Sequence, residues 1–173
     1  MNGSRLFSPR ITRSPLAFGI LWSFLVLISQ NSGAWEAIIE RDALGVPHIR
    51  GETDADTAFG LAFAQAEDGW EILEEALPYY RGNAAGYFGR KAVATDYLVK
   101  WLGFWEIIER DYSVKLKPET RRYLDAFAAG FNEFARVNPT RIQQDVLPVT
   151  PQDVIAAHMF RHLLFYGFDR HIA

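Results

Sequence analysis

The sequence predicts a mainly α-helical fold that begins with a small β-hairpin, and three observations support this prediction. Four stretches after residue 52 carry apolar side chains at the three- and four-residue intervals of a helix. Before them, residues 38–49 form two β-prone segments around a polar turn. The composition, 49% hydrophobic with 14% aromatic residues in a chain of 173, provides enough apolar surface for one packed domain.

The four predicted helices run from about Thr53 to Tyr80, Thr95 to Lys115, Glu119 to Asn138, and Pro151 to Tyr166. Thr53 or Asp54 is a suitable N-cap for the first helix, and Thr150 with Asp153 for the fourth. Pro47 cannot donate a ladder hydrogen bond, so the second extended segment is an edge strand or a strand start. We expect the acidic side chains of the first helix on a solvated face, away from its aromatic residues: Glu67, Asp68, Glu71, Glu74 and Glu75.

The apolar stripes predict which faces of the later helices pack against the core. The second helix is expected to bury one broad stripe: Leu98, Trp101, Leu102, Trp105, Ile108 and Tyr112. The fourth is expected to bury Ile155, Met159, Leu163 and Tyr166.

Residues 1–34 have the layout of a secretory signal peptide. Three arginines precede an uncharged run, residues 16–28, and small residues precede a cleavage point before Trp35. The alternative is an N-terminal membrane anchor, but this run is shorter than the roughly 20 residues that a spanning helix needs. We therefore expect a periplasmic or secreted protein that has no membrane association after the signal is removed.

Charge and cysteine content exclude several functions. The predicted signal holds three of the 18 basic residues and none of the 21 acidic ones, so the remainder carries 15 basic and 21 acidic side chains, a net charge of −6. Because no basic run or basic-aromatic stripe is present, we expect no nucleic-acid partner. The sequence contains no cysteine, which excludes disulfides, thiolate zinc sites and a cysteine nucleophile.

The segment from Arg41 to Asp68 carries the most specific motif. It reads Arg-Asp-x-x-Gly-Val-Pro-His-Ile, followed by Gly-x-x-x-Ala-Gln-x-x-Asp. The matching residues are Arg41, Asp42, Gly45, Val46, Pro47, His48, Ile49, Gly60, Ala64, Gln65 and Asp68. This order resembles the start of the α chain in the penicillin acylase family of N-terminal nucleophile hydrolases. The Ala66-Glu67 pair before Asp68 resembles the acyl-homoserine lactone and aculeacin acylase branch.

The resemblance implies that residues 35–173 form an α-chain segment that is incomplete at its C-terminal end. The full enzyme would have an αββα fold and would hydrolyse a linear non-peptide amide of an N-acyl substrate, such as a β-lactam side chain or an acyl-homoserine lactone. Its nucleophile would lie beyond residue 173, on a β chain released by autoproteolysis. The one serine after the signal, Ser113, lacks a nearby base and is interpreted as a helix-end hydroxyl. The segment itself is expected to hold no cofactor, and calcium is a candidate only for the full enzyme.

The resemblance also places a substrate wall late in the α chain, over residues 160–168. The candidate substrate-binding residues are His162, Phe165 and Tyr166. A purely structural interpretation of the same segment is that Leu163 and Tyr166 face the core of this chain.

Two other hypotheses stay open. One is a non-catalytic periplasmic helical binding module with the same architecture. The other is a metal-dependent hydrolase centred on His158 and His162, with Asp169 or His171 as a further ligand. A hydrogen-bonded histidine pair is the simpler interpretation, because Met159 occupies the position of the glutamate in the His-Glu-x-x-His motif. We therefore predict no metal site.

Overall fold

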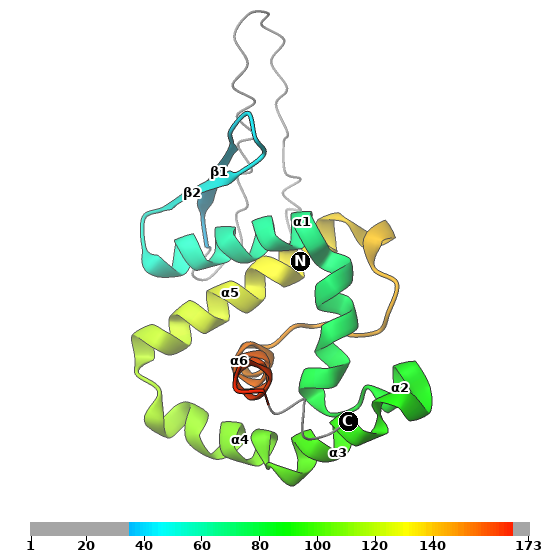
Figure 1. Cartoon of the computed structure of the whole chain (residues 1–173). Helices are drawn as coiled ribbons and strands as arrows, with labels where there is room; N and C mark the ends of the chain where they lie inside the picture. The colour runs from blue at the N-terminus through cyan, green and yellow to red at the C-terminus, as the bar shows by residue number, and fades with distance from the viewer. Residues whose placement is uncertain (1–34, 168–173) are drawn as a thin grey trace, which may run out of the picture.

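The computed structural model describes residues 35–167 and confirms a mainly helical fold with a two-stranded hairpin (Figure 1). Residues 1–34, which include the predicted signal peptide, and residues 168–173 lie outside the described residues. The elements are β1 (Ala37–Arg41), β2 (Pro47–Gly51), α1 (Asp54–Arg81), α2 (Ala85–Phe88), η1 (Gly89–Ala92), α3 (Val93–Trp101), α4 (Phe104–Lys115), α5 (Pro118–Val137), η2 (Pro139–Arg141) and α6 (Pro151–Phe165). The bounds predicted for the first, third and fourth helices agree within one or two residues.

The hairpin pairs β1 and β2 in antiparallel register, and Asp42 closes its turn. The Asp42 carboxylate accepts hydrogen bonds from the backbone N–H groups of Leu44 and Val46, at 2.9 and 3.0 Å. His48 Nε2 lies 3.3 Å from the same carboxylate. The hydrogen bonds from Val46, His48 and Leu44 lower the pKa of Asp42. His48 therefore supports the turn, in line with a structural role.

A capping box joins the hairpin to α1. The Thr53 hydroxyl accepts from the Asp56 backbone N–H at 3.2 Å, and the Asp56 carboxylate accepts from the Thr53 backbone N–H at 3.1 Å. The same carboxylate also accepts from the Glu36 backbone N–H, just before β1, at 3.1 Å. Burial opposes ionisation of Asp56, but these hydrogen bonds outweigh it and lower the pKa of the carboxyl group.

Replacing Asp56 with asparagine is expected to lower the free energy of unfolding by about 1–2 kcal/mol at pH 7. A carboxyl group with a lowered pKa stabilises the fold above its unfolded-state pKa of about 4. It loses that contribution as the pH falls through its folded-state value. The difference between wild type and Asp56→Asn should therefore shrink as the pH falls below about 4. Urea titrations at pH 7 and pH 3 would measure it, and a difference that stays constant would contradict this assignment.

The core forms where α5 crosses α1. Gly130 of α5 lies so close to α1 that a Cβ atom there would be 2.2 Å from the Phe59 carbonyl oxygen. Near this crossing, the fully buried Trp70 packs on Phe134, with ring centroids 5.7 Å apart, and Phe63 meets the same ring edge-on at 5.8 Å. Because these contacts link residues far apart in the chain, they fix the position of α5 on α1.

α1 changes direction at Gly69, where the backbone leaves helical geometry. Figure 1 shows the second half of α1 turning away from the first, with α6 in the middle of the molecule. α6 contacts α1, α4 and α5. The bend therefore creates a concave space on the inner side of α1, facing α5 and α6.

The helix predicted from Thr95 to Lys115 is two helices, so that prediction was wrong. α3 ends at Trp101 and α4 begins at Phe104, because Gly103 adopts a left-handed φ of +66° that terminates α3. Leu98 and Ile108 are buried as predicted, but Trp101 is 66% exposed. The sequence predicted a single stripe because the apolar spacing continues across the break. In the structure, α4 starts as a separate helix after Gly103.

The prediction of a solvated acidic face is wrong for Glu74. Its side chain is buried and accepts hydrogen bonds from the backbone N–H groups of Gln143 and Gln144, at 2.7 and 2.9 Å. Exposed Glu71, one turn earlier, forms an ion pair with Arg141 at 2.7 Å. All three partners belong to the segment after α5, which folds back over α1. Helical periodicity within α1 contains no information about that segment.

Candidate functional site

A buried ion pair anchors the start of α6 to the end of α1. Arg81 donates to Asp153 through Nε and Nη2, both at 2.8 Å, and Asp153 is only 1% exposed. Arg81 also donates to the carbonyl oxygens of Val146 and Pro148, at 2.7 and 2.9 Å. The hydrogen bonds that Arg81 donates to the Asp153 carboxylate raise the pKa of Arg81. The pair joins residues 72 positions apart, so sequence spacing offered no signal for it.

Two further contacts set the entry into α6. The Thr150 hydroxyl accepts from the Asp153 backbone N–H at 3.1 Å and the Asp153 carboxylate accepts from the Thr150 backbone N–H at 2.8 Å, which confirms the predicted cap. The Asn132 side chain of α5 exchanges two hydrogen bonds with the Val149 backbone, both at 2.8 Å. The loop before α6 is therefore held to α1 through Arg81 and to α5 through Asn132, and α6 packs against both of these helices.

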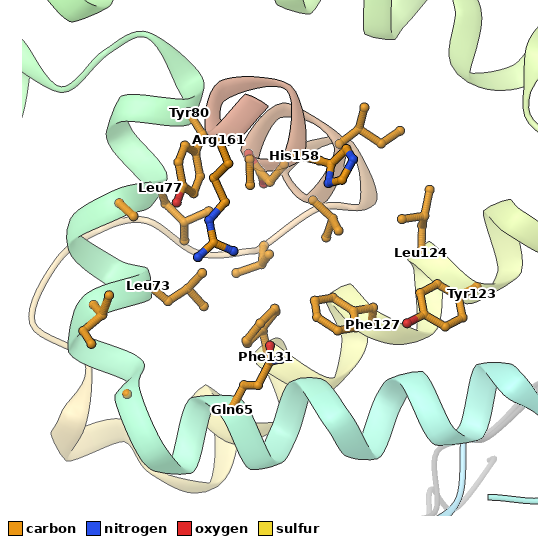
Figure 2. A pocket seen from close by; sticks show the side chains of 18 of the residues that line it. Gln65, Leu73, Leu77, Tyr80, Tyr123, Leu124, Phe127, Phe131, His158 and Arg161 are labelled. Carbon is orange, nitrogen blue, oxygen red and sulfur yellow. The ribbon is translucent and has the colours of Figure 1, made fainter. Parts of the chain in front are cut away.

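A cavity of about 850 Å³ lies between the second half of α1, α5 and α6. Its walls are mainly apolar, and Figure 2 shows Leu73 and Leu77 of α1 facing Phe127 and Phe131 of α5 across it. Its polar lining includes Gln65, Tyr80, Tyr123, His158 and Arg161. This volume falls within the range of about 300–1,000 Å³ typical of ligand pockets.

Arg161 is the distinctive polar residue of the cavity. Figure 2 shows its side chain extending from α6 toward Leu73 and Leu77 of α1. Two acidic residues also line the cavity, but each is engaged by another arginine: Asp68 by Arg41 and Asp153 by Arg81. Within residues 35–167, no carboxylate lies at ion-pair distance from Arg161. The apolar spacing of α6 gives no signal for Arg161, because this residue lies outside the apolar stripe.

The three predicted substrate-binding residues lie together around the C-terminal end of α6 but do not line this cavity. Phe165 and Tyr166 are 85% and 79% exposed, and His162 is exposed as well. The His162 and Tyr166 rings lie 6.3 Å apart, and those of Phe165 and Tyr166 lie 5.6 Å apart. Their role in substrate binding stays a prediction, which for residues 160–168 includes one residue outside the described range.

The buried face predicted for α6 is wrong at Tyr166 and incomplete elsewhere. Ile155, Met159 and Leu163 are half-buried, whereas Asp153 and Ala156 are the residues that pack most deeply. The reason is geometric: the ion pair with Arg81 draws the first turn of α6 into the protein and leaves its last turn at the surface. The alternative that Tyr166 faces the core of this chain is therefore also wrong.

The His158 and His162 rings lie side by side on one face of α6, with ring centroids 4.5 Å apart and planes tilted by 51°. His162 Nδ1 lies 3.2 Å from the His158 carbonyl oxygen, an ordinary contact within a helix. Across residues 35–167, no group of three or more histidine, aspartate or glutamate side chains is placed to hold a metal ion. Asp169 and His171, the further ligands of the metal hypothesis, lie outside the described residues.

Ser113 is exposed near the end of α4, and its backbone carbonyl accepts from Arg121 at 3.0 Å. In the described part of the chain, its hydroxyl has no hydrogen-bonded histidine or other base. A serine nucleophile needs such a base to take its proton. Ser113 therefore has the environment of a helix-end hydroxyl.

The motif from Arg41 to Asp68 forms one structural unit. Arg41 donates to the Gly45 carbonyl oxygen at 2.9 Å, and its Nη2 lies 2.8 Å from Asp68 and 3.1 Å from Glu67. The arginine therefore closes the hairpin turn and joins it to α1 at once. This geometry explains why residues separated by more than 20 positions occur in one pattern.

None of the helices within residues 35–167 has the length and apolar character needed to cross a membrane.

Comparison with known proteins gives a consistent result. The family model described as Penicillin amidase matches residues 36–172. An acyl-homoserine lactone acylase of Pseudomonas savastanoi pv. phaseolicola is 29% identical over 88% of this chain and 21% of its own length. The Penicillin acylase 2 proenzyme of Pseudomonas sp. strain SE83 is 33% identical over 66% of this chain and 15% of its own length. The chain thus spans about a fifth or less of these relatives.

A solved structure has the same fold. The thermostable penicillin G acylase from Alcaligenes faecalis superposes with a TM-score of 0.65 at 21% identity, over 76% of this chain and 74% of that chain. The match to the family model extends through the Arg41–Asp68 motif and through all of α1 to α6. The chain belongs to the penicillin amidase family.

Proposed function

We propose that this chain is the α-chain portion of an exported amide hydrolase. The full enzyme would cleave a linear non-peptide amide of an N-acyl substrate, either a β-lactam side chain or an acyl-homoserine lactone. The observation that carries this proposal is the family match over residues 36–172, which contains the Arg41–Asp68 unit. Relatives named penicillin acylase and acyl-homoserine lactone acylase support both substrate classes.

The partner of this chain would be its own β chain, released by autoproteolysis and carrying the nucleophile beyond residue 173. The name proenzyme of one relative supports processing. The nearly equal shares covered in the structural comparison, 76% and 74%, also indicate that the solved acylase contains a separate chain of similar length. In the two-chain enzyme, β1 and β2 would contribute to the αββα core and the helices to an outer layer.

The end of α6 would form one wall of the acyl pocket. Phe165 and Tyr166 present two aromatic rings at the surface, and an aromatic wall of this kind suits an apolar acyl group. His162 lies beside Tyr166 and would contribute a polar contact. We propose no cofactor for this segment, and calcium only as a candidate ligand of the full enzyme. The proposal that the protein is exported depends on the signal-peptide layout of residues 1–34.

Expression of the complete reading frame that contains this chain tests the proposal. We expect a precursor that is cleaved into two chains and hydrolyses an N-acyl homoserine lactone or a penicillin. Alanine in place of the new N-terminal residue of the second chain should abolish hydrolysis. A stop codon directly after Ala173 would contradict the proposal and leave the helical binding module. An intact frame whose product is never cleaved and hydrolyses no amide would also contradict it.

Replacing Tyr166 with alanine in the two-chain enzyme is expected to raise KM for N-acyl substrates about 10-fold, because an apolar contact worth about 1–3 kcal/mol is removed. The melting temperature should change little, because the ring is 79% exposed in this chain. Leu44→Ala, at the exposed hairpin turn, is the matched control and should leave KM unchanged. An unchanged KM for Tyr166→Ala would remove this residue from the acyl pocket.

A further inference from the structure

We propose that the cavity between α1, α5 and α6 is a docking site for a segment of the precursor's remaining polypeptide, which inserts an apolar side chain and pairs a carboxylate with Arg161. This inference rests on the proposed function, because it needs a precursor that continues beyond this chain. It differs from the proposed acyl pocket in its residues: α6 lines the cavity with residues 153–161, whereas His162, Phe165 and Tyr166 are not among the lining residues.

The walls of the cavity include large apolar and aromatic side chains that stay exposed in this chain. Ile72 of α1 is 76% exposed although it lines the cavity, and Tyr123 of α5 opposite is also exposed. A concave, mainly apolar site with a few polar groups is the usual form of a binding site in proteins. Because the walls come from three helices, the surface is concave and suits an inserted side chain better than a flat partner.

The charges within the cavity specify the chemistry of the partner. The carboxylates of Asp68 and Asp153 are neutralised at 2.8 Å by Arg41 and Arg81. Among residues 35–167, exposed Arg161 has no such partner, so the mainly apolar cavity presents one guanidinium group that no carboxylate neutralises. A guanidinium group that a docked chain removes from water requires a carboxylate with matched geometry. The segment therefore carries an aspartate, a glutamate or a chain terminus beside its apolar residue.

The amount of polypeptide outside this chain favours a protein segment over a small ligand. The relatives contain about five times as much sequence as the part that this chain spans. A fatty acid would also satisfy the volume and the arginine, so free ligand is the competing occupant. The labelling experiment below distinguishes this occupant by adding a fatty acid.

Thiol labelling provides that test, because the chain has no cysteine of its own. An Ile72→Cys variant is labelled with a maleimide in the isolated 173-residue chain and in the purified two-chain protein. Each rate is divided by the rate of the same protein in denaturant. We expect labelling at least 10-fold slower in the two-chain protein. Equal rates would overturn the proposal, and so would protection that appears only when dodecanoate is added, which would assign the cavity to a small carboxylate.

Charge substitution tests the role of Arg161. With the two portions expressed as separate chains, Arg161→Glu should weaken their association about 10- to 100-fold, and Arg161→Lys by less. Arg90→Glu, at an exposed site on η1, is the matched control and should change it less than twofold. Equal losses for the two glutamate variants would indicate general electrostatics and overturn the proposal. The isolated variants should melt at the wild-type temperature.

Hydrolysis assays on the same preparations separate the two proposals. Loss of the docking result with intact amide hydrolysis would overturn only the docking site. Protection of Ile72→Cys in a processed protein that hydrolyses no amide would overturn only the proposed function.

Discussion

Replacing Gly130 with alanine is expected to destabilise the protein by about 3 kcal/mol, the upper range for overpacking a core. The added Cβ atom would lie 2.2 Å from the Phe59 carbonyl oxygen and 2.9 Å from the Ala62 side chain, so α5 would have to move away from α1. The nearest atom belongs to the backbone and cannot rotate aside. Urea unfolding followed by circular dichroism would measure the change.

Gly86→Ala is the matched control for Gly130→Ala. Gly86 also lies in a helix, α2, but a Cβ atom there would meet nothing within 4 Å. In a helix with free space, replacing glycine with alanine stabilises by about 0.5–1 kcal/mol. The two variants therefore should change stability in opposite directions. A Gly130→Ala variant as stable as wild type would show that the helices do not cross at this distance.

Replacing Arg81 with methionine is expected to cost about 3–5 kcal/mol, because it leaves the Asp153 carboxylate buried without its partner. Two backbone carbonyl groups, those of Val146 and Pro148, would lose their donor as well. The loop before α6 and the first turn of α6 should be the parts most affected. Amide hydrogen exchange should show the loss of protection concentrated there.

Two controls separate the buried ion pair from a general loss of charge. Arg50→Met removes an exposed pair with Glu40 and should cost less than about 1 kcal/mol. Asp153→Asn placed on the Arg81→Met background should recover part of the loss, because it removes the unpaired charge. If both arginine variants lost the same stability, the pair at the base of α6 would have no special role.

Local features of this protein could be predicted from the sequence because their causes lie within a few residues. Thr53 with Asp56 and Thr150 with Asp153 form caps across one helical turn. The Arg41–Asp68 motif identified the family before any contact was known, and the structure links its ends through Arg41.

Features that depend on segments far apart in the chain were predicted poorly. Glu74 looked solvated within its own helix, yet the segment after α5 folds over it and donates two backbone hydrogen bonds. Tyr166 continued the apolar spacing of α6, but the buried contact of Asp153 orients that helix and leaves the ring at the surface. Gly103 interrupted a stripe whose spacing alone suggested one helix.

The candidate site divides in the same way. The residues at the end of α6 were named from a family pattern, and their part in binding stays a prediction. The cavity could not be found by pattern, because its walls are brought together by the bend at Gly69 and the crossing at Gly130. The sequence by itself determined the helices, their caps and the family, since these depend on local spacing and short motifs. Only the tertiary structure decided where Arg161 points and which apolar surface stays open, since both depend on long-range packing.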